Sequence, residues 1–167
     1  MQNQEVILFK NQQFRQAQDS DIANIRELVN SSYKELADMG LNYTATYQDE
    51  KITRERISKG KAFLLEKEGQ LIGTVLLKKE NWFTGKNSAY VSQLAVSPNF
   101  KRQGFGSLLM DLCEDLAVRE KFESIQLDTA KTATHLVSWY LMRGYRIVGE
   151  TKWEGKTYES WIFEKFI

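Results

Sequence analysis

The sequence is poor in the residues that build disulfides and metal sites. It contains one cysteine (Cys113), one histidine (His135) and one proline (Pro98) among 167 residues. A single cysteine cannot form an internal disulfide, which indicates a reducing compartment, and we expect the cytoplasm. One cysteine and one histidine are too few for a typical zinc site, so no metal is expected.

Charge of one sign and long hydrophobic runs are also lacking. The 23 basic and 22 acidic residues leave a formal net charge of +1, which argues against a general polyanion binder. No long basic tract is present, so we expect no nucleic-acid partner. Apolar runs extend over only a few residues, and a membrane helix needs about 20. The first residues, MQNQEVILFK, have neither the basic start nor the apolar length of a signal peptide, so no membrane partner is expected.

The composition is that of an ordinary globular chain. Hydrophobic residues make up 42% and charged residues 27% of the sequence. No repeat, low-complexity tract or linker rich in proline, glycine and serine divides it. We therefore expect a single domain over residues 1–167.

Hydrophobic periodicity predicts alternating groups of strands and helices. A strand over residues 14–18 is followed by a helix ending near Gly40 and a weaker helix ending near Gly60. Two strands joined at Glu68-Gly69 form a hairpin. The full order is strand, two helices, three strands, helix, strand, helix and two antiparallel strands. This order predicts a mixed α/β domain around a central sheet.

Two later segments carry more specific signals. In the strand YVSQLAVSP (90–98) the apolar residues alternate only in part, which indicates a β-bulge. The last helix is expected to be capped by Thr134 and to end at Gly144.

Two glycines, Gly104 and Gly106, open a helix in the stretch NFKRQGFGSLLMDLC. Glycine costs a helix interior about 1 kcal/mol relative to alanine, so bare backbone at this point needs a reason. The unpaired N–H groups and the positive end of the helix dipole form an anion site, to which Lys101 and Arg102 add charge. A tight strand-to-helix turn would explain the glycines equally well.

Two common nucleotide motifs do not fit this stretch. A dinucleotide fingerprint needs a third glycine where Leu109 stands. A Walker-type loop needs a lysine between the last glycine and the hydroxyl residue, whereas Ser107 follows Gly106 directly.

The motif and the order of elements together resemble the GCN5-related N-acetyltransferase (GNAT) family. The family signature is Arg/Gln-x-x-Gly-x-Gly/Ala; residues 101–106 match both glycines and differ at the first position, Lys101. The resemblance extends from about Phe14 to the C-terminus. It implies a mixed, mostly antiparallel central sheet flanked by helices, with a pyrophosphate site in the glycine turn and acetyl-CoA as cofactor.

The resemblance also implies cofactor-binding positions. Backbone groups of Leu94, Ala95 and Val96 would pair with the pantetheine arm as an added strand does. Positive charge from Lys101 and Arg102 would lie beside the pyrophosphate. Backbone amides would hold the pyrophosphate itself at Gln103, Gly104, Phe105, Gly106 and Ser107.

For catalysis, the resemblance places Tyr140 at the position of the general acid. A phenol with a pKa of about 10 can protonate a thiolate whose pKa is about 8.5 slightly uphill. Many relatives carry a carboxylate on the strand before the glycine turn, where this sequence has Ser92 and Gln93. A water relayed by Ser92 or Gln93 and a loop carboxylate, Asp49 or Glu50, stay open as the base. Cys113 is more simply a core residue, and His135 an exposed or capping residue.

The acceptor side carries the least specific signals. Tyr43 and Tyr47 lie in the loop that commonly forms the acceptor site of the family, although they could equally anchor that loop to the core. Trp82 and Phe83 could form a substrate wall or a hairpin tip. We therefore expect transfer of an acetyl group from acetyl-CoA to a primary amine of a small molecule or peptide, in a ternary complex. The alternative is a non-catalytic coenzyme A-binding sensor or interaction domain, and the resemblance allows a homodimer.

Overall fold

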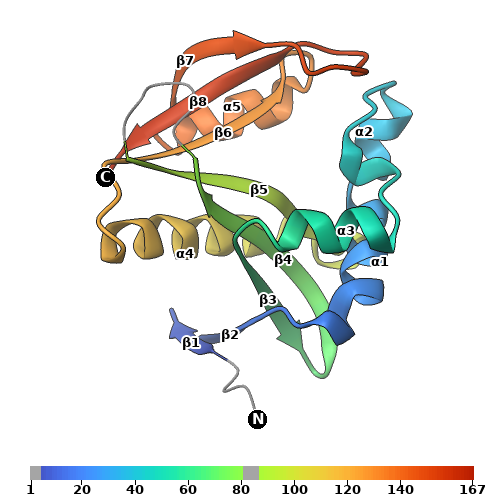
Figure 1. The fold of residues 1–167 in the computed structure, drawn as a ribbon, viewed down its shortest axis with the longest axis vertical. Coiled ribbons are helices and arrows are strands. Elements are labelled where there is room, and N and C mark those ends of the chain that lie inside the picture. The colour runs from blue at the N-terminus through green and yellow to red at the C-terminus, as the bar shows by residue number, and fades with distance from the viewer. Residues whose placement is uncertain (1–4, 81–86) are drawn as a thin grey trace.

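An eight-stranded sheet in the order β1-β2-β3-β4-β5-β6-β8-β7 forms the centre of the molecule (Figure 1). The computed structural model describes residues 5–80 and 87–167. The strands are β1 (Val6–Phe9), β2 (Gln12–Gln16), β3 (Lys61–Lys67), β4 (Gln70–Lys79), β5 (Ser88–Val96), β6 (Ser124–Ala130), β7 (Arg146–Thr151) and β8 (Ser160–Phe166). The helices are α1 (Ile22–Ser32), α2 (Lys34–Asp38), α3 (Glu50–Ile57), α4 (Phe105–Arg119) and α5 (Thr134–Met142). Neighbouring strands are antiparallel except β5 and β6, so the expected mixed, mostly antiparallel sheet is confirmed.

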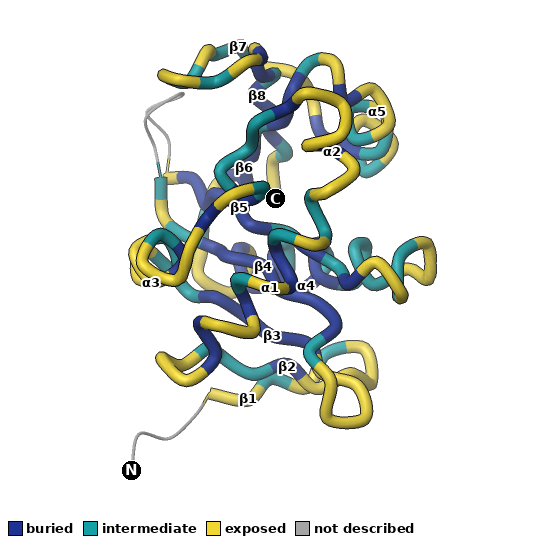
Figure 2. Tube along the Cα trace, turned by 90° about the vertical axis from the view of Figure 1, so that its right-hand side faces the viewer, coloured by how far each residue is buried: buried dark blue, intermediate teal, exposed yellow. Residues whose placement is uncertain are grey.

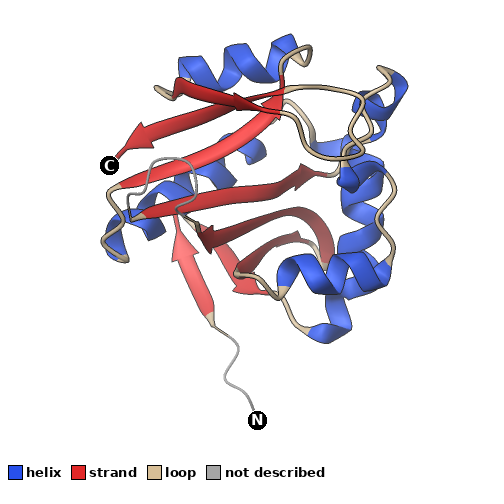
Figure 3. Ribbon diagram, turned by 45° about the horizontal axis from the view of Figure 1, so that its top comes forward, coloured by secondary structure: helices blue, strands red, loops and turns tan. Residues whose placement is uncertain are grey.

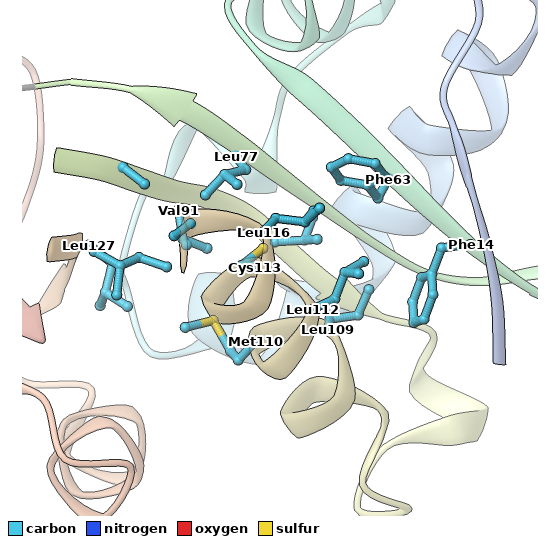
Figure 4. Close-up of a cluster of buried hydrophobic side chains, with 14 of the residues drawn as sticks. Phe14, Phe63, Leu77, Val91, Leu109, Met110, Leu112, Cys113, Leu116 and Leu127 are labelled. Carbon is cyan, nitrogen blue, oxygen red and sulfur yellow. The ribbon is translucent and has the colours of Figure 1, made fainter. Parts of the chain in front are cut away.

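Helices cover both faces of the sheet (Figure 3). On β3, Phe63 and Leu65 belong to the cluster that contains the apolar side of α4, whereas Leu64 belongs to the cluster with α1. Because successive side chains of a strand point to opposite faces, α4 and α1 lie on opposite sides of the sheet. Figure 4 shows the α4 side, where Leu109, Leu112 and other residues of the helix face the strands.

Burial falls from the centre of the sheet to its edges (Figure 2). Most residues of β4 and β5 are buried, while β1 and β7 consist of exposed and half-buried residues. In the part of the chain that the structure describes, no helix is long and apolar enough to cross a membrane.

Several predicted elements have different limits in the structure. Strand β1, which pairs with β2, is additional to the predicted order. The first predicted helix is divided into α1 and α2, with Tyr33 between them. The prediction that Thr134 caps the last helix is wrong, because Ala133 is the N-cap residue and its side chain makes no capping bond. The hairpin at Glu68-Gly69 is confirmed, with φ of 52° and 77° as a tight hairpin turn needs.

The bulge predicted in β5 is confirmed and lies at Gln93. Ser92 pairs with Leu76 and Ala95 with Thr74, so Gln93 and Leu94 stand opposite a single residue of β4. Gln93 has a φ of 52°, in the left-handed region.

Strands β5 and β6 pair over only a short distance. Their parallel register covers Ser88 to Tyr90 against Ser124 to Gln126. Beyond these residues the strands diverge, as Figure 1 shows toward the right of the view. The sheet is therefore open on the C-terminal side of Tyr90.

Candidate active site

A cavity of about 330 Å³ lies where β5 and β6 separate. Residues 90–94 of β5 and Leu127 and Asp128 of β6 contribute to its wall, together with side chains from α3, α5 and the loop between β7 and β8. Among the described residues, the wall has six aromatic, four cationic and one acidic side chain: Tyr33, Tyr43, Tyr90, Tyr140, Trp153 and Tyr158; Arg56, Lys59, Lys78 and Lys156; and Asp128.

The glycine turn lies at the start of α4. Gly104 is the N-cap residue with a φ of 87°, which residues with a side chain rarely adopt, and it offers no capping group to the first N–H groups. A Cβ added to Gly106 would lie 3.8 Å from Cη2 of Trp139 and 4.0 Å from Cγ2 of Val96, both ordinary contact distances. Packing within the protein therefore leaves room for a small side chain at position 106. The turn fits the phosphate groups of coenzyme A.

The two basic residues before the turn have different surroundings. The Lys101 ammonium donates to the carbonyl oxygen of Ser32 at 2.9 Å and lies 3.4 Å from a carboxylate oxygen of Glu35. Lys101 therefore caps the C-terminal end of α1, where carbonyl groups lack helical partners. Arg102 is exposed beside the turn, as is Gln103. Of Lys101 and Arg102, Arg102 is therefore the exposed side chain beside the start of α4.

The residues expected to bind pantetheine lie where β5 has left β6. The hydroxyl of Tyr33 donates to the carbonyl oxygen of Leu94 at 3.0 Å, and the N–H of Val96 donates to the Ser32 hydroxyl at 3.3 Å. Ala95 keeps its pairing with β4. This edge of β5 is therefore bonded to side chains rather than to a strand. An extended ligand could replace the Tyr33 and Ser32 hydroxyls in these hydrogen bonds.

Tyr140 lines the cavity from α5. It is 8% exposed, and its ring lies 4.9 Å from the ring of Trp139 and 5.6 Å from that of Phe163, measured between centroids. Burial raises the pKa of Tyr140 above its usual value, so the phenol keeps its proton at neutral pH. A proton donor thus faces the cavity.

Ser92 and Gln93 both reach the cavity wall. Gln93 is 4% exposed, and its Oε1 accepts a hydrogen bond of 3.0 Å from Nε2 of Gln48. The Oε1 of Gln48 in turn accepts from the Arg56 guanidinium at 2.6 Å. The Nε2 of Gln93 is buried without a hydrogen-bond partner among the described residues. The bulge therefore introduces a chain of polar side chains that the sequence did not indicate.

The carboxylate in the cavity comes from β6. Asp128 accepts hydrogen bonds from Nε1 of Trp153, at 2.9 Å, and from the hydroxyl of Tyr90. Burial, and next the charge of Asp128, raise the pKa of Tyr90 well above its usual value, so Tyr90 stays protonated. Sequence reasoning overlooked Asp128. The available signal was an acid near the end of the buried strand SIQLD, where acids are rare unless they are paired or functional.

The other acid and base candidates lie elsewhere. Asp49 caps α3, accepting from the N–H of Ile52 at 2.8 Å, and Glu50 is exposed. His135 is exposed. Cys113 is fully buried in the core, and burial raises the pKa of its thiol, which confirms core packing over a nucleophile.

Tyr43 serves the fold and the cavity together. Its hydroxyl accepts from the N–H of Ala130 at 2.8 Å and lies 2.8 Å from the hydroxyl of Thr129, which ties its loop to β6. Its ring lines the cavity and stacks on Tyr158 with centroids 4.7 Å apart.

Tyr47 lies outside the residues that line the cavity and is 56% exposed. The ammonium of Lys156 donates to its hydroxyl at 3.1 Å and lowers the pKa of Tyr47. A role for Tyr47 in acceptor binding stays a prediction. Trp82 and Phe83 lie outside the described residues.

Comparison with known proteins identifies the family. Residues 22–145 match the model of the acetyltransferase (GNAT) family. The chain belongs to the GNAT family. The cofactor of the GNAT family is acetyl-CoA, as expected from the glycine turn.

Individual relatives support this assignment. The S-alkylcysteine N-acetyltransferase of Bacillus subtilis (strain 168) is 27% identical over 147 residues, which cover 85% of this chain and 83% of that protein. The ribosomal-protein-S18-alanine N-acetyltransferase from Escherichia coli has a TM-score of 0.73 at 14% identity over 92% of both chains. A GNAT acetyltransferase from Elizabethkingia anophelis with acetyl-CoA bound has a TM-score of 0.61 at 17% identity, covering 71% of this chain and 84% of that one. The solved structures share the GNAT fold, so the predicted fold is confirmed.

Proposed function

We propose that this GNAT protein transfers an acetyl group from acetyl-CoA to the primary amine of a small molecule, by direct attack in a ternary complex. The observation that carries the proposal is that Tyr140 and Asp128 line one cavity at the point where β5 and β6 separate. In this reaction the carbon–sulfur bond breaks, a carbon–nitrogen bond forms, and the amine proton must leave while sulfur gains one. Acetyl-CoA supplies the activated acetyl group. The whole chain acts as one domain in this proposal.

The backbone that continues from the cavity wall at Leu94 into the start of α4 suits the cofactor. The N–H groups of residues 103–107 would hold the pyrophosphate, with the positive end of α4 and the exposed Arg102 beside them. The edge groups of Leu94 and Val96 would hold the pantetheine arm in place of the Tyr33 and Ser32 hydroxyls.

Tyr140 is the proposed proton donor to sulfur. Its raised pKa makes it a weaker acid than a phenol in water. However, a thiolate in the same cavity is also an anion, and burial raises the pKa of its conjugate acid in the same direction. The gap between about 10 and about 8.5 in water therefore does not widen by the full effect of burial on Tyr140.

Asp128 is the proposed proton acceptor. Its carboxylate attracts the ammonium form of an acceptor, and the proton passes to it directly or through a water held near Ser92 and Gln93. An α-amine with a pKa near 7.7 is neutral in about one molecule in six at pH 7, whereas a lysine amine with a pKa near 10.4 is neutral in about one in 2,500. The demand on the base is therefore smallest for an α-amine.

The cavity favours an acceptor of amino-acid size. Its volume of about 330 Å³ is at the lower end of the range for ligand sites. The relative from B. subtilis acts, by its name, on S-alkylcysteine. We propose an S-alkylcysteine or a similar amino acid as acceptor here, with the alkylthio group against the aromatic wall, where sulfur–ring contacts are favourable.

The first experiment is thermal unfolding with acetyl-CoA and with adenosine. Acetyl-CoA at 100 times its Kd should add about 2.7 kcal/mol of stability, which raises the Tm by roughly 5 to 10 °C, and adenosine should add little. No shift at saturation would contradict the proposal.

Turnover separates an enzyme from a non-catalytic coenzyme A-binding domain. Thiol release with S-methyl-L-cysteine should fall about 100-fold in the Asp128→Asn variant. The matched control is Asp38→Asn, the same change at an exposed residue on α2 that pairs with Lys34. Binding of acetyl-CoA without release of thiol from any amine would favour the non-catalytic alternative.

The cytoplasmic location and the homodimer stay predictions. The single thiol is buried in the core, which is compatible with a reducing compartment. Edge strand β7 exposes Ile147 and Val148, and a second copy could pair there.

A further inference from the structure

We infer that the cavity recognises a carboxylate on the acceptor and that the Arg56 guanidinium binds it. This inference rests on the proposed function, because it names the residue that would bind the carboxylate of the proposed amino-acid acceptor. The charge of the wall is the first indication. The described residues that line the cavity include four cationic side chains and one acidic side chain, and this excess of positive charge favours an anionic ligand.

Lys156 has little capacity left for a ligand. Its ammonium donates to the carbonyl oxygen of Asn42 at 3.0 Å, to the Thr44 hydroxyl at 2.9 Å and to the Tyr47 hydroxyl at 3.1 Å. An ammonium has three protons, so these bonds use all of them. Lys156 therefore holds the loop after α2 against the loop between β7 and β8.

The other three lining cations differ in how many of their N–H donors already have partners. Lys78 pairs with Glu80 at 3.0 Å, and Lys59 is exposed at the end of α3. Arg56 makes one side-chain hydrogen bond among the described residues, to Gln48, although a guanidinium carries five N–H donors. Among the described residues, Arg56 is therefore the half-buried lining cation with the most donors to spare.

The surroundings of Arg56 also favour an incoming anion. Burial lowers the pKa of Arg56, and no carboxylate of the described residues pairs with it. A partly buried cation without an acidic partner is costly, and a ligand carboxylate offsets that cost. The planar guanidinium can donate two parallel hydrogen bonds to a carboxylate, which an ammonium cannot do.

The chain of glutamines fixes Arg56 relative to the bulge in β5. A guanidinium only donates, so Gln48 must turn its oxygen to Arg56 and its NH₂ group to Thr53 and Gln93, at 2.9 and 3.0 Å. Gln93 then turns its oxygen to Gln48, which leaves its own buried NH₂ group without a partner in the described structure. Arg56 is thus two hydrogen bonds from the bulge residue, and Gln48 is a positioning residue for it.

Arg56 and Asp128 together match a zwitterion. Both line the same cavity, and each lies within the electrostatic field of the other. An acceptor with its carboxylate on Arg56 presents its ammonium toward Asp128, the proposed proton acceptor. The two charges would therefore orient the acceptor as well as bind it.

The test compares S-methyl-L-cysteine with its primary amide, which keeps the amine and the side chain and loses the charge. We expect the wild-type protein to favour the acid over the amide by at least about 10-fold in kcat/KM. Arg56→Gln should lower kcat/KM for the acid about 10- to 100-fold and for the amide less than 3-fold. Arg54→Gln is the matched control, since it makes the same change on the same helix at an exposed residue that pairs with Asp19 outside the cavity wall, and it should keep the preference.

Gln48→Met tests the positioning role. It leaves the charge of Arg56 in place and removes the bond that orients it. The preference for the acid should fall mainly through KM, with kcat for the amide unchanged, whereas a merely structural defect would lower both substrates alike. Thermal unfolding of each variant checks that it folds.

Calorimetric titration of S-methyl-L-cysteine into each protein saturated with coenzyme A gives a readout that does not depend on turnover. Binding that weakens at least about 10-fold in Arg56→Gln and stays within about 2-fold in Arg54→Gln supports the inference. Equal binding to wild type and Arg56→Gln, no binding to wild type, or an acid preference that survives in Arg56→Gln would overturn it. Acetylation of acid and amide alike would overturn this inference alone, whereas calorimetric binding of the acid with no thiol release from any amine would instead contradict the proposed enzyme.

Discussion

The two sides of the cavity are built in different ways. The proposed donor side begins at the cavity wall with Leu94 in β5 and continues beyond it to Ser107 in α4, so it is nearly continuous in sequence and would present backbone groups. The acceptor side collects side chains from distant segments, such as Arg56 in α3, Asp128 in β6 and Lys156 near the C-terminus. A backbone site needs a local motif, whereas a side-chain site needs the whole fold. For this reason, the cofactor that the GNAT family shares is easier to infer from this sequence than the acceptor is.

Tyr140 belongs to both sides, so its removal should have the largest effect. Tyr140→Phe should lower kcat at least about 100-fold, because a general acid contributes about 10²- to 10⁴-fold. Acetyl-CoA binding, measured by calorimetry, should stay within about 2-fold. Tyr145→Phe is the control, since that hydroxyl bonds to Glu114 and not to the cavity. A Tyr140→Phe protein with half the wild-type kcat would contradict the assignment.

The donor side can be tested by two changes that differ in their physical effect. Gly106→Asp adds a carboxylate to the first turn of α4, where the helix dipole favours it and a Cβ meets only ordinary contacts, so the Tm should not fall. The same carboxylate repels a pyrophosphate, so acetyl-CoA binding should weaken about 10-fold or more. Gly104→Ala forces a side chain to a φ of 87° and should lower stability by about 1 kcal/mol. Calorimetric binding and thermal unfolding separate the two effects. Wild-type affinity for acetyl-CoA in Gly106→Asp would show that the glycine turn does not bind the pyrophosphate.

Tyrosines of the cavity wall should make the free energy of unfolding sensitive to alkaline pH. Burial raises the pKa of Tyr33, Tyr140 and Tyr158 above their unfolded value of about 10. Above pH 10 the unfolded chain therefore binds fewer protons than the folded one, so their contribution is intact below about pH 10 and is lost as the pH rises. Each such group should cost about 1.4 kcal/mol per pH unit in this range.

Urea unfolding at pH 8, 9.5 and 10.5 measures this dependence. Tyr140→Phe removes one of these groups, so its stability should fall less steeply than that of the wild type above pH 10. An identical slope in both proteins would mean that Tyr140 titrates normally in the folded state.

Tyr47 should give the smallest effect. Its hydroxyl is outside the cavity wall and meets Lys156, which keeps two other hydrogen bonds without it. Tyr47→Phe should change kcat/KM for S-methyl-L-cysteine less than about 2-fold. A change above 10-fold in steady-state assays would extend the acceptor site to the rim of the cavity.

Sequence reasoning succeeded where the signal is local. The bulge at Gln93 followed from broken alternation within one strand, and the glycine turn from a spacing of two residues. The hairpin at Glu68-Gly69 was read from its turn residues. Each of these features depends on neighbours a few positions away.

It failed where a tertiary contact decides the outcome. Asp128 is far in sequence from β5, the strand on which we looked for an acid. Only the parallel pairing of β5 with β6 brings Asp128 to the cavity. The hydrogen bond of Lys101 to the end of α1 was not foreseen for the same reason, and the place of Lys101 beside the pyrophosphate stays a prediction. The Thr134 cap failed because the chain enters α5 one residue earlier, at Ala133.

The short pairing of β5 with β6 has a mechanical consequence. In the described sheet, three residue pairs are the only ladder that joins the half from β1 to β5 to the half from β6 to β8. A strand-like ligand between the halves would act as a splint and slow hydrogen exchange of amides on both sides of it. The acceptor wall contains residues from both halves of the sheet. The distance between these residues would therefore be set only once the strand-like ligand is bound. Donor loading before acceptor binding is the order that this sheet favours.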